Sequence, residues 1–203
     1  DIIDLGERGK FTVSIVDAGN PVVYLIPQEL GLKGTELPVE VEGMPEILSL
    51  IEDIRSVAAE IIGIVPDRSI APAQSPAYPK IGFVSAPQDY INPEGILVKA
   101  DEVDLVARLA SMQKMHRAYM ITGAISTGAA AQIPGTVVHD IISERAKASD
   151  TLIIGHPYGP MEVVITTRDK KICSEAVYRT ARKILDGCVY IPFSRIYGDI
   201  RPE

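Results

Sequence analysis

The stretch Thr122-Gly-Ala-Ile-Ser-Thr-Gly-Ala-Ala-Ala-Gln-Ile133 decides the fold. It consists almost entirely of small residues, and Pro134 and Gly135 close it. A helix of this composition has no polar face, so it needs to be enclosed by other elements. We therefore expect residues 122–133 to form a central helix that the rest of the chain surrounds.

Short apolar runs on both sides of this helix are typical of strands. Residues 11–16 and 22–26 are rich in β-branched side chains and flank the cluster Asp17-Ala-Gly-Asn-Pro21, which forces a turn. Further strands are expected at residues 80–85, 152–154, 161–167 and 188–191.

Three other segments are expected to be helical. Residues 45–62 carry apolar side chains at helical spacing, and Glu52, Asp53 and Arg55 are available for the solvent-exposed face. Gly63 ends this predicted helix. Residues 101–119 begin acidic and end basic, which suits the helix macrodipole. Residues 175–185 precede Gly187, a typical helix stop. The proline-rich residues 66–79 favour an extended connection.

Strands and helices therefore mix without one helix between successive strands, and this pattern favours an α+β fold over a doubly wound parallel sheet. The expected architecture is a small-residue helix enclosed by curved strands.

The composition excludes several classes of protein. The chain has 203 residues, of which 46% are apolar, so it can bury a real core and is not intrinsically disordered. Its 20 basic and 27 acidic residues give a net charge of −7, which argues against nucleic acid and anionic membranes as partners. A small anion can still be bound by local backbone dipoles.

No apolar run approaches the length of a membrane span, and the first ten residues lack the pattern of a signal peptide. We expect a cytoplasmic chain. Asp1 rather than methionine at the first position suggests a natural start further upstream. Cys173 and Cys188 favour ordinary packing over a disulfide, and no Cys or His pair has metal-ligand spacing.

The start of the small-residue helix is the first candidate site. Free backbone N–H groups at a helix N-terminus can bind a carboxylate, and Gly123 and Ala124 allow a ligand to approach closely. The hydroxyl groups just inside the helix either cap it or donate to the ligand. Two cationic groups before it either complement carboxylate charge or are solvated surface side chains. The hydroxyl groups are those of Thr122, Ser126 and Thr127, and the two cationic groups are Lys114 and His116.

Two loops are further candidates. Gly19 and Asn20 can point backbone and amide groups into the mouth of a pocket, or they simply form a turn. The loop 155–159 contains His156, its only group that titrates in the physiological range. Taken alone, His156 is an ordinary loop histidine. Together, these residues indicate a small-anion site without phosphate-loop, zinc or triad signatures.

Three segments carry a resemblance to a known family. They are Val13-Ser-Ile-Val-Asp-Ala-Gly-Asn-Pro-Val-Val23, Ser111-Met-Gln-Lys-Met-His-Arg-Ala-Tyr-Met-Ile-Thr-Gly-Ala124 and Ile133-Pro-Gly-Thr-Val-Val138. Gly155-His-Pro and the ending Arg179-Thr-Ala-Arg-Lys…Gly187 agree with them. The chain resembles the PrpF family of cofactor-independent isomerases of unsaturated di- and tricarboxylates, which includes methylaconitate, methylitaconate and oxalomesaconate isomerases.

The resemblance implies a diaminopimelate-epimerase-like fold, in which a strongly curved, mainly antiparallel sheet wraps round a central helix. The family has two such domains with the substrate between them. Residues 1–203 resemble the second of these two domains as a single domain, so the first domain would be absent. The family's proposed proton-transfer lysine and cysteine lie in that first half, so the catalytic residues of this chain are unknown.

What the resemblance transfers to this chain is the carboxylate-binding half, at Gly19, Asn20 and the start of the central helix. Epimerases have Ala-Cys-Gly-Thr-Gly where Ala124-Ile-Ser-Thr-Gly128 stands, so two-thiol racemisation is not implied. The implied reaction is a 1,3-proton shift that needs no metal or organic cofactor.

Three functions stay open at this point. The chain is part of an isomerase of small unsaturated polycarboxylates, or a non-catalytic carboxylate-binding or accessory module that acts with an aconitase-like dehydratase. In the third, it pairs with a separately encoded first-domain half of the same protein. An exposed apolar cleft face would then favour dimerisation or poor solubility.

Overall fold

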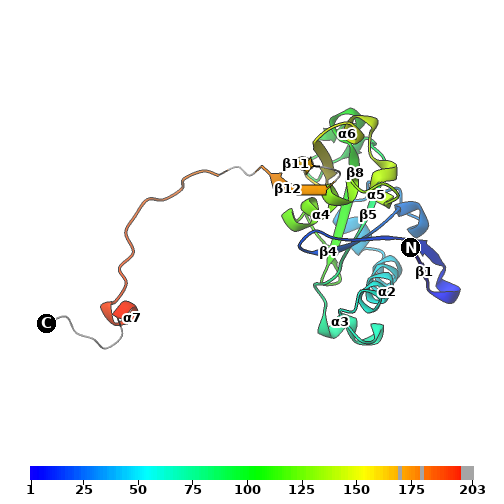
Figure 1. Ribbon diagram of the computed structural model, residues 1–203, viewed down its shortest axis with the longest axis horizontal. Coiled ribbons are helices and arrows are strands. Elements are labelled where there is room, and N and C mark those ends of the chain that lie inside the picture. The colour runs from blue at the N-terminus through cyan, green and yellow to red at the C-terminus, as the bar shows by residue number, and fades with distance from the viewer. Residues whose placement is uncertain (169–170, 179–180, 198–203) are drawn as a thin grey trace.

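The computed structural model describes residues 1–168, 171–178 and 181–197, and Figure 1 shows the arrangement of their elements. Within these residues an eight-stranded sheet has the order β12-β11-β10-β8-β5-β4-β3, and β9 pairs with β8. The strands are β3 (Ser14–Asp17), β4 (Pro21–Leu25), β5 (Lys80–Ser85), β8 (Leu105–Ser111), β9 (Lys114–Met115), β10 (Thr151–His156), β11 (Gly159–Arg168) and β12 (Lys171–Val177).

The sheet is strongly curved and mainly antiparallel, as predicted. Only β8 with β10 and β4 with β5 run parallel in the described sheet. The strand, turn and strand predicted from residue 11 onward are confirmed, with one difference. Val13 separates β2 (Lys10–Thr12) from β3, and β2 pairs instead with β1 (Ile2–Asp4).

The central small-residue helix is confirmed as α4 (Ile121–Ala131). It packs against strands from both halves of the sheet, β3 and β4 on one side and β10, β11 and β12 on the other. Gly128 shows why small residues are needed, because an added Cβ would lie 3.1 Å from Val163 and 3.2 Å from Ile165. The sheet therefore encloses α4 closely.

Helix α2 (Pro45–Ile61) covers the other face of the sheet, together with α1 (Pro38–Glu42) and the β1–β2 ribbon. Side chains alternate between the two faces, as a strand requires. On β4, Tyr24 packs in the core that contains α4, whereas Val23 and Leu25 pack in the core that contains Ile54 of α2. The sheet thus separates two hydrophobic cores.

The remaining described elements are short. They are η1 (Gly6–Arg8), η2 (Pro27–Leu30), η3 (Arg68–Ile70), α3 (Ala71–Gln74), the pair β6 (Tyr90–Ile91) and β7 (Leu97–Val98), η4 (Ala100–Glu102), α5 (Val137–Ile141), α6 (Glu144–Lys147) and α7 (Phe193–Tyr197). Helix α5 begins at Thr136, whose hydroxyl accepts a hydrogen bond from the N–H of His139 at 3.1 Å.

The helix predicted at residues 101–119 is wrong. This region contains β8, the residues Met112 and Gln113 with φ of 55° and 60°, and then β9. Strand β8 lies between β5 and β10, so its residues are buried on both faces and the sequence shows a nearly continuous apolar run. Such a run fits helical and strand spacing alike.

Two smaller predictions also need correction. Arg55 is not on a wet face, because its side chain is buried and donates to the carbonyl oxygens of Ser75 and Tyr78, each at 2.9 Å. The connection at residues 66–79 is not wholly extended, since it contains η3 and α3. The remaining helix of the prediction, residues 45–62, is confirmed to within one residue.

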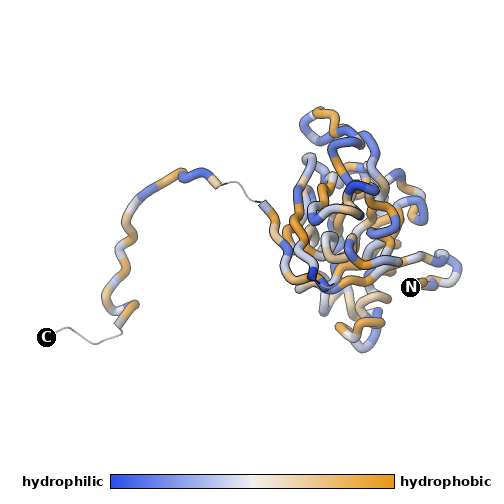
Figure 2. The backbone as a smooth tube through the Cα atoms, turned by 45° about the horizontal axis from the view of Figure 1, so that its top comes forward, coloured by the Kyte–Doolittle hydropathy of each residue, from blue (hydrophilic) through white to orange (hydrophobic). Residues whose placement is uncertain are grey.

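The C-terminal predictions fail as well. Residues 175–177 belong to β12 rather than to a helix, and the described residues 181–192 form neither a helix nor a strand. Positions 179 and 180 of the predicted helix lie outside the described residues. From residue 181 the described chain extends away from the body of the protein, with apolar and polar stretches interspersed along it (Figure 2).

Candidate functional site

The start of α4 is not capped by any side chain. Its N-cap residue is Met120, which has extended backbone angles, and the N–H of Ala124 donates to the carbonyl oxygen of Met120 at 2.8 Å. The N–H groups of the first turn therefore point out of the helix end. The suggestion that Thr122, Ser126 or Thr127 caps this helix is wrong.

The hydroxyl groups of Ser126 and Thr127 point into the core. Thr127 Oγ1 donates to the carbonyl oxygen of Gly123 at 2.8 Å and lies 3.1 Å from the Tyr24 hydroxyl and 2.9 Å from the Tyr119 hydroxyl. Ser126 Oγ donates to the carbonyl oxygen of Val16 at 3.1 Å. Both side chains hold α4 to its surroundings, and contact with a ligand stays a prediction for them.

Thr122 and Gly123 lie in the first turn of α4, unlike Ser126 and Thr127. The Thr122 side chain is exposed at the first turn of α4. Gly123 is buried, and an added Cβ would lie 2.6 Å from Leu109 Cδ2. Ala124 is buried too. The first turn thus presents main-chain N–H groups together with one exposed hydroxyl.

The turn with Gly19 and Asn20 and the hairpin before Lys114 lie at the same end of the sheet. Strands β4 and β5 begin at this end, where Val22 is paired with Lys80, and the turn with Gly19 and Asn20 precedes β4. Strand β8 runs antiparallel to β5 and therefore ends here, at the hairpin before Lys114, whereas β10 ends at His156 level with the first half of β8, because Gly155 pairs with Val106. His116 N–H donates to the carbonyl oxygen of Leu109 at 2.7 Å.

His156 lies close enough to Arg108 and His116 for their positive charges to act on its pKa. Burial, together with the positive charges of Arg108 and His116, lowers its pKa to about 4. The imidazole of His156 is therefore neutral at pH 7. Its Nδ1 accepts a hydrogen bond from the N–H of Tyr158 at 3.2 Å, which leaves Nε2 as the donor. Nδ1 of His116 is buried without a hydrogen-bond partner among the described residues.

Arg108 is a residue that the sequence analysis missed. Its buried guanidinium donates to four carbonyl oxygens, those of Glu36 at 2.7 Å, Thr35 at 3.0 Å, Ala107 at 2.9 Å and Gly155 at 3.2 Å. Burial lowers its pKa to about 10. The signal was one arginine inside the apolar run 105–110. Arg108 fixes the loop that carries His156, because Gly155 is one of its acceptors.

Two buried tyrosines were also missed. Desolvation raises the pKa of Tyr119 to about 12 and raises that of Tyr24 well above its usual value. Both hydroxyl groups therefore stay protonated and serve as hydrogen-bonding groups around Thr127. Nothing in their sequence neighbourhood distinguishes them from ordinary core aromatic residues.

The predicted residues therefore fall into four groups. Gly19, Asn20, Lys114 and His116 lie at or near one end of the sheet, with Gly19 and Lys114 exposed, whereas His156 lies level with the first half of β8. Thr122, Gly123 and Ala124 form the first turn of the helix. Ser126 and Thr127 lie deeper, with their hydroxyl groups bonded within the fold.

A strongly curved, mainly antiparallel sheet around a small-residue helix defines the class, that of the diaminopimelate-epimerase-like α+β folds. The PrpF protein family model matches residues 1–192, so the chain belongs to the PrpF family.

Characterised relatives have similar sequences over nearly all of this chain. The 3-methylitaconate isomerase of Eubacterium barkeri is 38% identical over 93% of this chain and 50% of its own length. The 2-methyl-aconitate isomerase of Shewanella oneidensis is 31% identical over 95% of this chain and 49% of its own. A crystal structure of methylitaconate-delta-isomerase superposes with a TM-score of 0.88 at 36% identity, and the match covers all of this chain and 52% of that one.

The chain thus spans about half the length of the curated relatives that it matches. Among the described residues no helix is both long and apolar enough to cross a membrane. The same residues contain no group of three or more His, Cys, Asp and Glu side chains placed to hold a metal ion. Cys173 and Cys188 are free and exposed, so the prediction of ordinary packing for their side chains is wrong.

Proposed function

We propose that this chain is the carboxylate-binding half of an isomerase that acts on small unsaturated di- and tricarboxylates without a cofactor. The observation that supports this function best is the uncapped start of α4, whose Gly123 lies beside Leu109, the residue that also accepts the hydrogen bond of the His116 N–H. The names of the related isomerases support the reaction class.

The proposed reaction is a 1,3-proton shift. A base removes a proton next to a carboxylate, and an acid returns one across the resulting allyl system. The N–H groups at Ile121, Thr122 and Gly123 stabilise the carboxylate on which negative charge accumulates, and such a donor is worth roughly 3–4 kcal/mol where one has been removed from an oxyanion site. Neutral His156 contributes a hydrogen bond from Nε2 rather than a positive charge.

We assign the proton-transferring groups to the other half of the protein and residues 1–203 to one domain. A cytoplasmic location is part of the proposal, and the free cysteines agree with a reducing compartment. The substrate is taken from the class that contains aconitate, methylaconitate and methylitaconate. An accessory role beside an aconitase-like dehydratase is the alternative that the experiment must exclude.

Proton NMR in D₂O with these acids separates binding from chemistry. We expect the 203-residue chain to broaden the substrate signals without allylic deuterium uptake, and uptake to begin when the missing half is supplied. Ile121→Pro removes one N–H where proline suits the first turn and should weaken binding about tenfold. Ile121→Ala keeps that N–H and is the matched control.

Equal binding by the two Ile121 variants would contradict the role of the helix start. Deuterium uptake by the isolated chain would contradict the placement of the acid and base. Binding that never leads to exchange in the assembled protein would favour the accessory role.

A further inference from the structure

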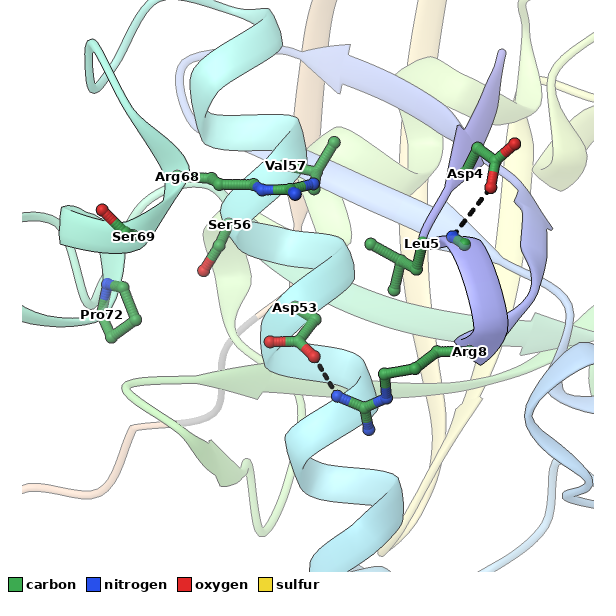
Figure 3. Close-up of a pocket in the computed structure, with 10 residues that line it drawn as sticks. Asp4, Leu5, Arg8, Asp53, Ser56, Val57, Arg68, Ser69 and Pro72 are labelled. Carbon is green, nitrogen blue, oxygen red and sulfur yellow. Dashed lines mark hydrogen bonds and ion pairs between the residues drawn. The ribbon is translucent and has the colours of Figure 1, made fainter.

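A cavity of about 530 Å³ lies on the α2 side of the sheet, whereas α4 packs against the opposite face. It is formed where the β1–η1–β2 ribbon, helix α2 and the η3–α3 segment meet (Figure 3). Its size is that of a small-molecule pocket, for which roughly 300–1,000 Å³ is typical. We call it the ribbon pocket, lined among others by Leu5, Arg8, Asp53, Ser56, Arg68 and Pro72.

Ser56 supplies a hydrogen-bonding group that the fold does not use. Its side chain lies on α2 and is only 5% exposed, and its Oγ has no hydrogen-bond partner among the described residues. A serine inside a helix commonly bonds back to a carbonyl of the preceding turn, and a buried hydroxyl left unpaired costs about 1–3 kcal/mol. An unpaired hydroxyl that lines a cavity is explained by a ligand that bonds to it.

Arg68 supplies an unpaired charge. It is the first residue of η3, and its side chain extends toward α2 beside Val57 (Figure 3). Its guanidinium makes no hydrogen bond or ion pair with any residue that the structure describes, and Asp67 is the only charge recorded as interacting with it. Arg8, in contrast, is held by Asp53 and by Ser49 Oγ at 3.3 Å.

The acidic groups of the ribbon pocket are already neutralised. Asp53 pairs with Arg8, and Asp4 pairs with Lys10 at 2.9 Å and accepts the N–H of Gly6 at 2.9 Å. Arg68 is therefore the cation of the pocket that has no ion-pair partner among the described residues, with Asp67 acting on it through its charge, and it is the group with which an anion can pair. Leu5, Val57 and Pro72 add apolar walls, which suit a short hydrocarbon body.

We propose that the ribbon pocket binds a small carboxylate with a short hydrocarbon body. Its carboxylate pairs with the Arg68 guanidinium, whose planar fork matches two oxygens, and a polar atom of the ligand bonds to Ser56 Oγ. This site is independent of the proposed isomerase function, because none of its residues lies at the start of α4.

The test follows amide chemical shifts of the 203-residue chain by ¹⁵N NMR during a titration with succinate. We expect saturable shifts at Gly6, Ser56 and Ser69. Arg68→Gln should weaken the succinate Kd at these amides at least tenfold, and Ser56→Ala should weaken it severalfold. Arg168→Gln removes an exposed arginine elsewhere, on β11, and should leave the Kd unchanged.

Each opposing result has a clear meaning. Shifts confined to Thr122, Gly123 and their neighbours would overturn the ribbon pocket and leave the proposed function intact. An equal Kd for Arg68→Gln and Arg168→Gln would overturn the role of Arg68. Inorganic phosphate that binds the same amides as tightly as succinate would overturn the choice of a carboxylate with a hydrocarbon body.

Discussion

Glu175 is a carboxyl group that the fold buries without a partner. Its Oε1 has no hydrogen bond among the described residues, and it lies 2.8 Å from the position of an added Cβ on Gly128. Desolvation raises the pKa of Glu175 to about 7. No cation acts on its pKa, and the ionisable group that senses its charge is Tyr24, inside the same core.

This shift predicts how stability depends on pH. A carboxyl whose folded pKa exceeds the unfolded value binds more protons when folded, so its contribution is greatest below about pH 4.5 and is lost as pH rises toward about 7. Glu175→Gln should remove this loss and make the chain more stable at pH 8 by about 1 kcal/mol, since partial exposure screens the charge.

Urea unfolding at pH 5 and pH 8 measures this difference. Glu162→Gln, at an exposed position on the neighbouring strand β11, is the matched control and should follow the unmodified chain. An identical pH dependence for Glu175→Gln and the unmodified chain would mean that water reaches the Glu175 carboxyl in solution.

Gly82 illustrates a residue that the neighbouring backbone dictates. An added Cβ would lie 2.5 Å from the carbonyl oxygen of Arg108 on the paired strand and 2.8 Å from Leu109 Cδ1. The backbone of a paired strand cannot move aside as the end of a flexible side chain can. Gly82→Ala should therefore destabilise the chain by about 1–3 kcal/mol in urea unfolding. Gly187→Ala, at a position with open space, should change stability little; equal losses in both would refute the steric explanation.

At the scale of elements, α4 is held in place by a hydroxyl network. Thr127 Oγ1 joins the buried hydroxyl groups of Tyr24 and Tyr119 to the carbonyl oxygen of Gly123. Thr127→Val keeps the shape, removes the partner of the Tyr119 hydroxyl and leaves the Tyr24 hydroxyl only its 3.5 Å bond to the carbonyl oxygen of Gly123, so it should cost about 1–3 kcal/mol of stability. Thr122→Val, the same change at an exposed position of α4, should stay within about 0.5 kcal/mol.

Thermal unfolding of both variants tests this expectation. A Thr127→Val protein as stable as Thr122→Val would show that water replaces the lost hydrogen bonds, and hence that this part of the core is hydrated.

The elements that the sequence predicted well are those whose local residue pattern is compatible with only one kind of secondary structure. The small residues of α4 cannot face water, and Asp17-Ala-Gly-Asn-Pro21 contains a glycine with φ of +83°, so the helix and the turn both follow from local chemistry. Strand β8 could not be predicted, because an apolar run buried on both faces has no strand period. The partners that bury it, β5 and β10, are distant in sequence.

The candidate site shows the same limit. The start of α4, the 17–21 turn and the 155–159 loop were recognisable from their residues, but only the strand pairing shows that the turn lies at the end of β8 and the loop level with its first half. The hydroxyl groups of Ser126 and Thr127 looked available in the sequence, although both face the core. Arg108 was hidden, because the carbonyl oxygens that satisfy it come from segments distant in sequence.

At the scale of the whole molecule, the described C-terminal segment stands apart from the body (Figures 1 and 2). Its apolar side chains are largely exposed, with Ile184 at 88%, Leu185 at 85% and Tyr190 at 95%. Side chains that bury nothing add nothing to the stability of the body, whereas exposed apolar groups in a row favour association. We expect this segment to be a contact surface for the other half of the protein.

Deletion of residues 181–203 tests this view. Because the body keeps both of its cores, the Tm should fall by less than about 2 °C, a shift that corresponds to at most about 1 kcal/mol in a domain of this size. Self-association in analytical ultracentrifugation should decrease, since the exposed apolar row is removed. Replacement of Ile184, Leu185 and Tyr190 by serine in the complete chain is the control that keeps the length, and it should reduce association to the same extent. A large fall in Tm after the deletion would mean that the segment folds back onto the body in solution, and the contact surface would then have to be sought on the sheet end beside α4.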